Sequence, residues 1–150
     1  MISATRWVSI LSAAAGAVFL AATVKLGSLE RGGPRHADLV LEGGIPATLF
    51  LPGEGSETQG FRDPPSPVEG PPGLVLAHGF AGDRRTMSSA ARRLARAGLA
   101  VLTLDLSGHG ENRNPGRGSI ARSDSFHRDL VAAVDFLRMS RHVDGSRIAV

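Results

Sequence analysis

The sequence predicts an α/β fold built on a parallel sheet, and three apolar segments carry that prediction. Two of them, Gly73–Phe80 and Leu99–Asp105, have the pattern of buried strands that end in glycine-marked turns. The third begins at Arg147 and runs to Val150. Residues with helical spacing fill both gaps between these segments. An alternation of strand, helix, strand, helix and strand is typical of right-handed crossovers and of a parallel sheet.

A β-hairpin is expected ahead of the parallel strands. Asp38–Glu42 and Ile45–Leu51 are apolar runs joined by Gly43-Gly44, a pattern that indicates two strands and a tight turn. Pro46 lacks a backbone donor, which favours an edge position for the second run. Residues 52–72 are rich in Pro, Gly, Ser and Glu and are expected to form a long loop or linker.

The first helix is predicted between Thr86 and Ala97. Its apolar residues recur at helical spacing, with arginines on the other side, and Gly98 stands where a left-handed C-terminal cap belongs. The apolar positions are Met87, Ala90, Ala91, Leu94 and Ala95.

The second helix is predicted after a glycine- and asparagine-rich loop, Ser107–Ser119. Asp124 or Ser125 can cap its first turn, because their side-chain oxygens accept hydrogen bonds from the free N–H groups there. Asp144-Gly145 is predicted to turn the chain into the last strand. One apolar stripe of this helix contains Phe126, Leu130, Ala133, Val134 and Leu137.

Composition limits the classes of partner. At 150 residues the chain is long enough for one domain, and 42% apolar residues are enough for a core. The net charge is only +3, the 17 basic residues are dispersed, and Lys25 is the only lysine. Aromatic residues for base stacking are few, so no nucleic-acid partner is expected. The absence of cysteine excludes disulfides, thiolate metal sites and a cysteine nucleophile.

Residues 1–26 are expected to meet a lipid bilayer. Trp7–Val24 contains no charge and lies between Arg6 and Lys25. About 20 apolar residues span a bilayer, so the segment is predicted to be a single-pass N-terminal membrane anchor. A secretory signal, whose apolar region is usually about 7–15 residues, is the alternative, and cleavage would release a secreted protein. A buried soluble helix is the third interpretation. Residues 27–36 are expected to be a linker.

The turn after the first parallel strand is the first candidate site. A sharp turn there leaves the backbone N–H groups of Phe80 and Ala81 facing the space above the sheet, and Gly79 is expected to remove a Cβ that would block it. These N–H groups, with the helix start nearby, are suited to a developing oxyanion. The alternative is that Gly79 and Gly82 merely end a strand.

His78 and His109 each stand beside glycine at a strand end. A general-base or metal-ligand role is weighed against a structural role, and hydrogen bonding to loop backbone is favoured. A zinc site needs at least three protein ligands, and no spacing supplies the third, so neither metal nor cofactor is expected. Asp105 ends its strand, where a catalytic acid is one possibility and anchoring of the next loop is the favoured one.

A dinucleotide-binding fold also opens with a strand, a glycine-rich turn and a helix. Here the turn reads Gly79-Phe80-Ala81-Gly82-Asp83, which is not G-x-G-x-x-G, and no P-loop lysine exists. Nucleotide binding is therefore a minor alternative.

Three ordered motifs resemble the α/β-hydrolase superfamily, especially its bacterial esterase, lipase and serine-peptidase-like branches. They are Leu74–Phe80, Asp105–Gly110 and Val143–Val150. The resemblance covers 37–150, which corresponds to the N-terminal part of such a domain.

The resemblance implies roles for these residues. His78-Gly79 matches the family's HG turn, and the N–H of Phe80 matches one donor of the oxyanion hole. Asp105 and Gly108-His109-Gly110 match a D-x-x-G-H-G loop that shapes the pocket and is not catalytic. Asn112 stands where many relatives have serine. In the family, the strand matching Ile148–Val150 leads into a G-x-S-x-G elbow that presents the nucleophile, and the acid and histidine follow.

Two functions are therefore carried forward. The favoured one is the N-terminal part of a membrane-anchored serine hydrolase, which cleaves a small ester or a peptide by acyl transfer to a serine beyond residue 150. The second is a short, non-catalytic, membrane-associated binding protein of the same ancestry. The first is favoured because an oxyanion turn has no use without a nucleophile and because parallel strands need further βα units to cover them.

Overall fold

The computed structural model describes residues 33–53, 70–115 and 119–150, with side chains from residue 124 in the last range. The predicted anchor, residues 27–32 of the predicted linker 27–36 and most of the loop 52–72 lie outside these ranges. Residues 35 and 36 of that linker already belong to the first strand. Within them, no helix is both long enough and apolar enough to cross a membrane.

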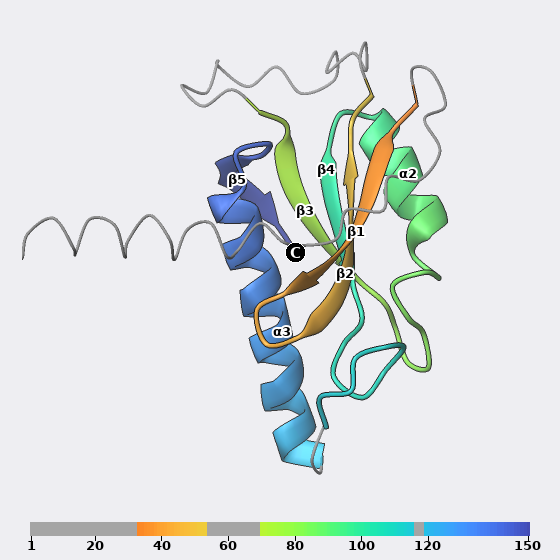
Figure 1. Ribbon diagram of the computed structural model, residues 1–150, viewed down its shortest axis with the longest axis vertical. Coiled ribbons are helices and arrows are strands. Elements are labelled where there is room, and N and C mark those ends of the chain that lie inside the picture. The colour runs from red at the N-terminus through yellow and green to blue at the C-terminus, as the bar shows by residue number, and fades with distance from the viewer. Residues whose placement is uncertain (1–32, 54–69, 116–118) are drawn as a thin grey trace, which may run out of the picture.

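The described strands form one mixed sheet of five, in the order β1-β2-β4-β3-β5 (Figure 1). β1 pairs with β2 and β2 with β4 in antiparallel fashion, whereas β3 is parallel to both β4 and β5. The predicted hairpin and parallel unit are therefore confirmed. The strands are β1 Arg35–Leu41, β2 Ile45–Leu51, β3 Pro72–Ala77, β4 Ala100–Leu104 and β5 Asp144–Ala149.

The hairpin turn depends on its two glycines. Gly43 and Gly44 have φ of 78° and 76°, left-handed values that glycine adopts without steric cost. The edge position predicted for Pro46 is wrong, because β2 lies between β1 and β4. Pairing between β2 and β4 begins at Ala47, so Pro46, which has no N–H to donate, lies just beyond the end of that ladder. The Pro46 carbonyl still accepts a hydrogen bond from the Asp105 N–H at 2.9 Å.

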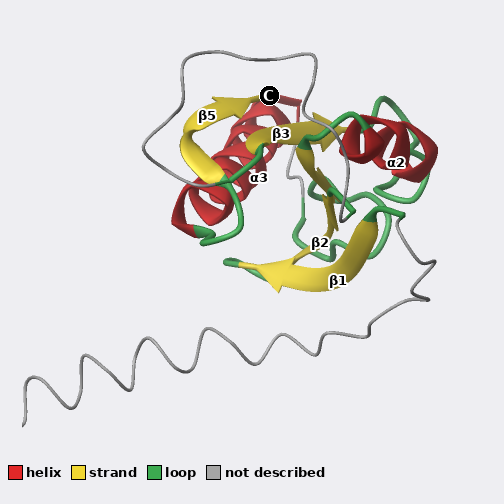
Figure 2. Cartoon of the chain, turned by 90° about the horizontal axis from the view of Figure 1, so that it is seen from above, coloured by secondary structure: helices red, strands yellow, loops and turns green. Residues whose placement is uncertain are grey.

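Helix α2, Ser88–Arg96, covers one face of the sheet (Figure 2). Ala91 and Ala95 are fully buried there and pack in a cluster with Phe50 and Val101. Ala90, predicted to be on the buried face, is exposed, because the face that meets the sheet is narrow and is centred on Ala91 and Ala95. The predicted cap is confirmed: Gly98 has a φ of 94° and its N–H donates to the Ala95 carbonyl at 3.1 Å.

Helix α3, Ser119–Met139, covers the opposite face (Figure 2). The predicted caps Asp124 and Ser125 are wrong, because both lie more than one turn inside the helix, where no free N–H groups remain. The predicted apolar stripe is confirmed as part of the larger core cluster. Its fully buried members are Ala133 and Leu137.

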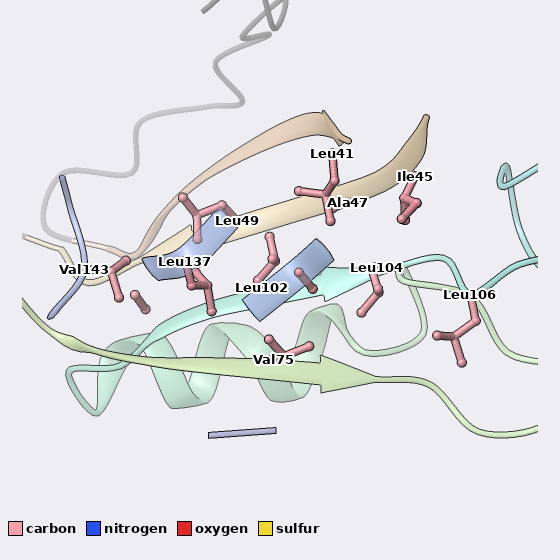
Figure 3. Close-up of a cluster of buried hydrophobic side chains, with 12 residues drawn as sticks. Leu41, Ile45, Ala47, Leu49, Val75, Leu102, Leu104, Leu106, Leu137 and Val143 are labelled. Atoms are coloured by element: carbon pink, nitrogen blue, oxygen red, sulfur yellow. The ribbon is translucent and has the colours of Figure 1, made fainter. Parts of the chain in front are cut away.

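The larger cluster fills the space between the sheet and α3 (Figure 3). Leucine and valine side chains from β3, β4 and the hairpin meet there, so apolar burial holds the strand ends that carry the site. The labelled members are Leu41, Ile45, Ala47, Leu49, Val75, Leu102, Leu104, Leu106, Leu137 and Val143.

β5 begins earlier than predicted. The turn lies at 140–143, where the Val143 N–H donates to the Ser140 carbonyl at 3.2 Å, and Asp144 is already the first residue of the strand. The fully buried Asp144 donates its N–H to the Pro71 carbonyl at 2.9 Å and accepts from Arg147 Nε at 2.6 Å. The bond to Pro71 ties the start of β5 to the start of β3, which explains why a typical turn residue stands in a strand.

Candidate active site at the carboxyl ends of the parallel strands

Directly after β3 the chain forms a tight β-turn over Gly79–Gly82. The Gly82 N–H donates to the Gly79 carbonyl at 3.1 Å, which leaves Phe80 and Ala81 as the two central residues. Ala81 has a φ of 58°, the only positive value at a non-glycine residue in the described ranges. A negative φ followed by a positive one defines a type II turn. The left-handed conformation costs an alanine about 1–2 kcal/mol, and such strain tends to persist at functional positions.

The glycine that this turn requires is Gly82, and the expectation for Gly79 is wrong. A Cβ on Gly79 would meet open space, and its φ is not positive. A Cβ on Gly82 would lie 3.1 Å from the His78 Cβ and 3.2 Å from the Gly79 carbonyl oxygen. A side chain is therefore disfavoured at Gly82, the last residue of the turn, and not at Gly79, its first residue.

The central N–H groups of the turn are available to a ligand. In the part of the chain that the structure describes, no hydrogen bond occupies the backbone N–H of Phe80 or Ala81. Phe80 is 98% exposed, so no other described residue covers it. Two adjacent unoccupied N–H donors can bind an anion or stabilise an oxyanion as it forms.

His78 is a fixed structural element of the turn. Its ring is buried, and the Leu106 N–H donates to Nε2 at 3.2 Å, so that nitrogen carries no proton. The proton is therefore on Nδ1, which donates to the Gly79 carbonyl at 2.8 Å. With both ring nitrogens occupied, His78 has no free position for proton transfer or for a metal.

His109 also bonds loop backbone. Its Nδ1 lies 3.1 Å from the Ser107 carbonyl, and its ring packs between His78 and Phe126 at centroid distances of 5.2 and 5.7 Å. Among the described residues there is no group of three His, Cys, Asp or Glu side chains able to hold a metal.

Asp105 organises the loop that follows β4. Its fully buried carboxylate accepts the Arg84 N–H at 2.7 Å, the Glu111 N–H at 2.9 Å and a bond from the Arg84 guanidinium. Gly110 makes this possible. Its φ is 52°, and a Cβ there would lie 2.5 Å from the Asp105 carboxylate. Gly108 is likewise left-handed, with a φ of 76°.

Arg84 and Glu111 are site residues that sequence reasoning missed. The Arg84 guanidinium reaches Glu111 Oε2 at 2.8 Å, and Arg85 reaches Oε1 of the same carboxylate at 2.5 Å. Burial opposes the charge on Arg84, but the bonds to Glu111 and Asp105 outweigh it and raise the pKa of Arg84 above its ordinary value. The hydrogen bond from Arg84 lowers the pKa of Glu111. An Arg-Arg pair ahead of a helix is too common a pattern to have indicated this network.

Three further polar residues hold the loop after β4 and were also missed or underrated. The buried Asn112 donates from Nδ2 to the Asp105 carbonyl at 2.8 Å. Asn114 donates to the Gly43 carbonyl at 2.8 Å, which joins the loop to the hairpin. Asp129 of α3 accepts the Ser107 N–H at 2.6 Å.

A cavity of about 600 Å³ opens at the tip of the hairpin. The loop after β4 and helix α3 contribute Ser107, Asn114 and Asp129 to its lining. Phe80 and Ala81 do not line it, so the predicted oxyanion donors and this cavity are separate features of the same sheet edge.

Comparison with known proteins agrees with this architecture. The family model described as serine aminopeptidase, S33, matches residues 72–150. No curated protein matches the sequence. An acetyl xylan esterase from Paenibacillus sp. R4 has a TM-score of 0.61 at 22% identity, over 94% of this chain and 49% of its own.

Two other solved structures are similar. A hypothetical protein from Pseudomonas aeruginosa has a TM-score of 0.57 at 24% identity, over 81% of this chain and 35% of its own. Acetyl xylan esterase 1 from Thermoanaerobacterium sp. JW/SL YS485 has a TM-score of 0.54 at 18% identity, over 86% of this chain and 44% of its own. The chain thus spans half or less of the length of these three structures, which at such identities establish the fold alone.

The three parallel strands β3, β4 and β5, the HG turn after β3 and the D-x-x-G-H-G loop after β4 all lie within the segment that the family model matches. The chain belongs to the S33 serine aminopeptidase family of the α/β-hydrolase superfamily.

Proposed function

We propose that this chain supplies the oxyanion-binding turn of a serine hydrolase that cleaves ester or amide bonds by acyl transfer. The observation that carries the proposal is the type II turn Gly79–Gly82, whose central N–H groups have no partner among the described residues. Donors that are already in place where charge develops are commonly the largest single contribution to this kind of catalysis.

In this proposal the nucleophilic serine lies beyond residue 150. The sequence contains no G-x-S-x-G. β5 is parallel to β3 and adjacent to it, so chain continuing from β5 would emerge at the sheet edge that carries Gly79–Gly82. A serine on such an elbow would face the turn, with the acid and histidine following later.

The described residues would then act at one step. As the serine attacks the substrate carbonyl, the carbonyl oxygen gains negative charge. That oxygen then accepts hydrogen bonds from the N–H of Phe80 and from the N–H of the residue that follows the serine. The substrate is a small ester or a peptide. Esterase relatives in structure and an aminopeptidase family model support both bond types without selecting one.

Active-site labelling tests this function. The intact gene product, isolated from its own cells, is treated with a fluorophosphonate and digested, and the modified residue is located by mass spectrometry. We expect one labelled serine in a G-x-S-x-G that follows Val150. The 150-residue chain alone is the control and should remain unlabelled. An intact product that takes no label, from a gene with no such motif, would favour the non-catalytic alternative.

We also propose that Trp7–Val24 holds the protein on a membrane. The uncharged apolar run between Arg6 and Lys25 supports this. Ala15→Arg, near the middle of the run, should weaken insertion by about 2.5–3.5 kcal/mol. Membrane fractionation with carbonate washing measures the effect, and Arg6→Ala is the control. Soluble protein with an intact N-terminus would contradict the anchor, and protein shortened within residues 1–26 would indicate a cleaved signal.

A further inference from the structure

The turn Gly79–Gly82 is fastened to the loop after β4 on both of its sides. Before the turn, the His78 ring accepts the Leu106 N–H at 3.2 Å. After the turn, the Arg84 N–H donates to Asp105 Oδ1 at 2.7 Å. β3 and β4 are adjacent in the sheet, so the pairing of these strands continues past their ends as side-chain bonds.

Arg84 makes the second attachment twice over. Besides its backbone N–H, its guanidinium bonds Asp105 Oδ2 and reaches Glu111 Oε2 at 2.8 Å. The Asp105 carboxylate also accepts the Glu111 N–H at 2.9 Å, which closes the network on the loop after β4. One side chain thus joins the segment that follows the turn to two positions of the neighbouring loop.

Net stability alone does not account for this arrangement. The Arg84 side chain is 7% exposed, and removing a guanidinium from water offsets most of what a buried ion pair contributes. Its Nε is buried and has no hydrogen-bond partner in the described ranges. What the pair does provide is a fixed distance between two loops, and the loop that benefits contains the strained Ala81.

We infer that Arg84 is a positioning residue for the oxyanion turn, which acts through Asp105 to hold the N–H groups of Phe80 and Ala81 in place. The inference rests on the proposed function. A left-handed alanine relaxes unless its surroundings hold it. A misplacement of about 1 Å in a catalytic group costs on the order of 10²-fold in rate, so release of this attachment reaches the chemistry.

Two adjacent arginines provide a matched test in the intact protein. Arg84→Met removes the guanidinium bonds to Asp105 and Glu111, whereas Arg85→Met removes an arginine that is 67% exposed and bonds Glu111 only. For a p-nitrophenyl ester, we expect Arg84→Met to lower kcat by about 10–10²-fold with KM little changed. The affinity for a trifluoromethyl ketone, which forms a tetrahedral adduct, should fall by the same factor. Arg85→Met should match wild type in all three measurements.

A second readout does not depend on activity. The Gly82 N–H closes the turn by bonding the Gly79 carbonyl, so its hydrogen exchange reports on turn opening. Exchange at Gly82 should accelerate in Arg84→Met and not in Arg85→Met, while the Leu102 amide in β4 remains protected in both. Arg84→Lys keeps the charge but lacks the forked guanidinium that bonds both carboxylates, so it should fall between wild type and Arg84→Met.

Each outcome decides the inference. Folded Arg84→Met or Arg84→Lys with wild-type kcat, ketone affinity and Gly82 exchange would overturn it. An equal loss of protection at Gly82 and Leu102 would also overturn it, because the effect would then be global. A wild-type protein that neither hydrolyses esters nor takes the fluorophosphonate would refute the proposed function instead. In that case the Gly82 exchange would still establish whether Arg84 holds the turn.

Discussion

The loop after β3 and the loop after β4 follow neighbouring parallel strands, yet they are built in opposite ways. The first is exposed at its tip and leaves the N–H groups of Phe80 and Ala81 without partners among the described residues. The second is held by side-chain hydrogen bonds of Asp105, Asn112 and Asp129. N–H groups that are left free for a ligand form no hydrogen bonds that could stabilise their own loop. The comparison therefore indicates that the loop after β4 holds the loop after β3 in place.

The largest expected effect comes from removing the centre of the bonded loop. Asp105→Ala leaves the buried Arg84 without its closest partner, and breaking a buried pair in this way costs about 3–5 kcal/mol. Urea unfolding of the intact protein measures the loss. Asp135→Ala is the control, since its pair with Arg138 is exposed at 3.6 Å and such pairs contribute about 0–1 kcal/mol. Equal losses of unfolding free energy in the two variants would show that the Asp105 network contributes no more to stability than an exposed ion pair.

The next effect removes a donor from the open loop without unfolding it. Phe80 is the first central residue of a type II turn, a position that proline favours, so Phe80→Pro deletes the N–H while the turn is kept. Losing one oxyanion donor costs about 10²–10³-fold in kcat. Phe80→Ala keeps the N–H and should change mainly substrate preference. Circular dichroism checks folding, and a folded Phe80→Pro enzyme with near wild-type turnover would remove Phe80 from the oxyanion hole.

A pair of glycine substitutions separates strain from crowding. Gly110→Ala introduces a Cβ 2.5 Å from the Asp105 carboxylate at a left-handed residue, and it should destabilise the protein by about 2–4 kcal/mol through both effects. Gly43→Ala is also left-handed, but its Cβ would meet open space, so only about 1–2 kcal/mol is expected. The melting temperatures compare them. If Gly43→Ala cost as much as Gly110→Ala, crowding against Asp105 would be unimportant.

The smallest effect is the pH dependence of Glu111. Its pKa lies below the ordinary 4.5, because Arg84 hydrogen-bonds the charged carboxylate. A depressed carboxyl pKa contributes stability that is present above the unfolded value and is lost as the pH falls through the folded value. The melting temperature of wild type should therefore exceed that of Glu111→Gln above about pH 4.5, and the two should converge below it. A difference that persisted unchanged to the lowest pH would contradict an ionic role for Glu111.

Local patterns in the sequence were enough to predict the helices, the strands and the loops that carry the site. Apolar periodicity indicated both helices and the parallel strands, and Gly43-Gly44 marked a turn that needs two left-handed residues. These features are legible because periodicity, turn chemistry and chain direction act over a few residues. Because β3 and β4 are parallel, the turn at Gly79 and the loop at Asp105 then lie at the same edge of the sheet.

Tertiary structure decided the remainder, because it depends on residues far apart in the chain. Pro46 lies in an interior strand and not at an edge, because the fold places β2 between β1 and β4. Asp144, which is a typical turn residue, begins a strand because its N–H bonds the Pro71 carbonyl. Arg84 became a site residue only when the fold placed Asp105 beside it, 21 positions further on. Ala81 adopts a left-handed conformation that an isolated alanine avoids, because bonds on both sides of its turn hold it there. No local pattern encodes such contacts, since their energy exists only once both partners have been brought together.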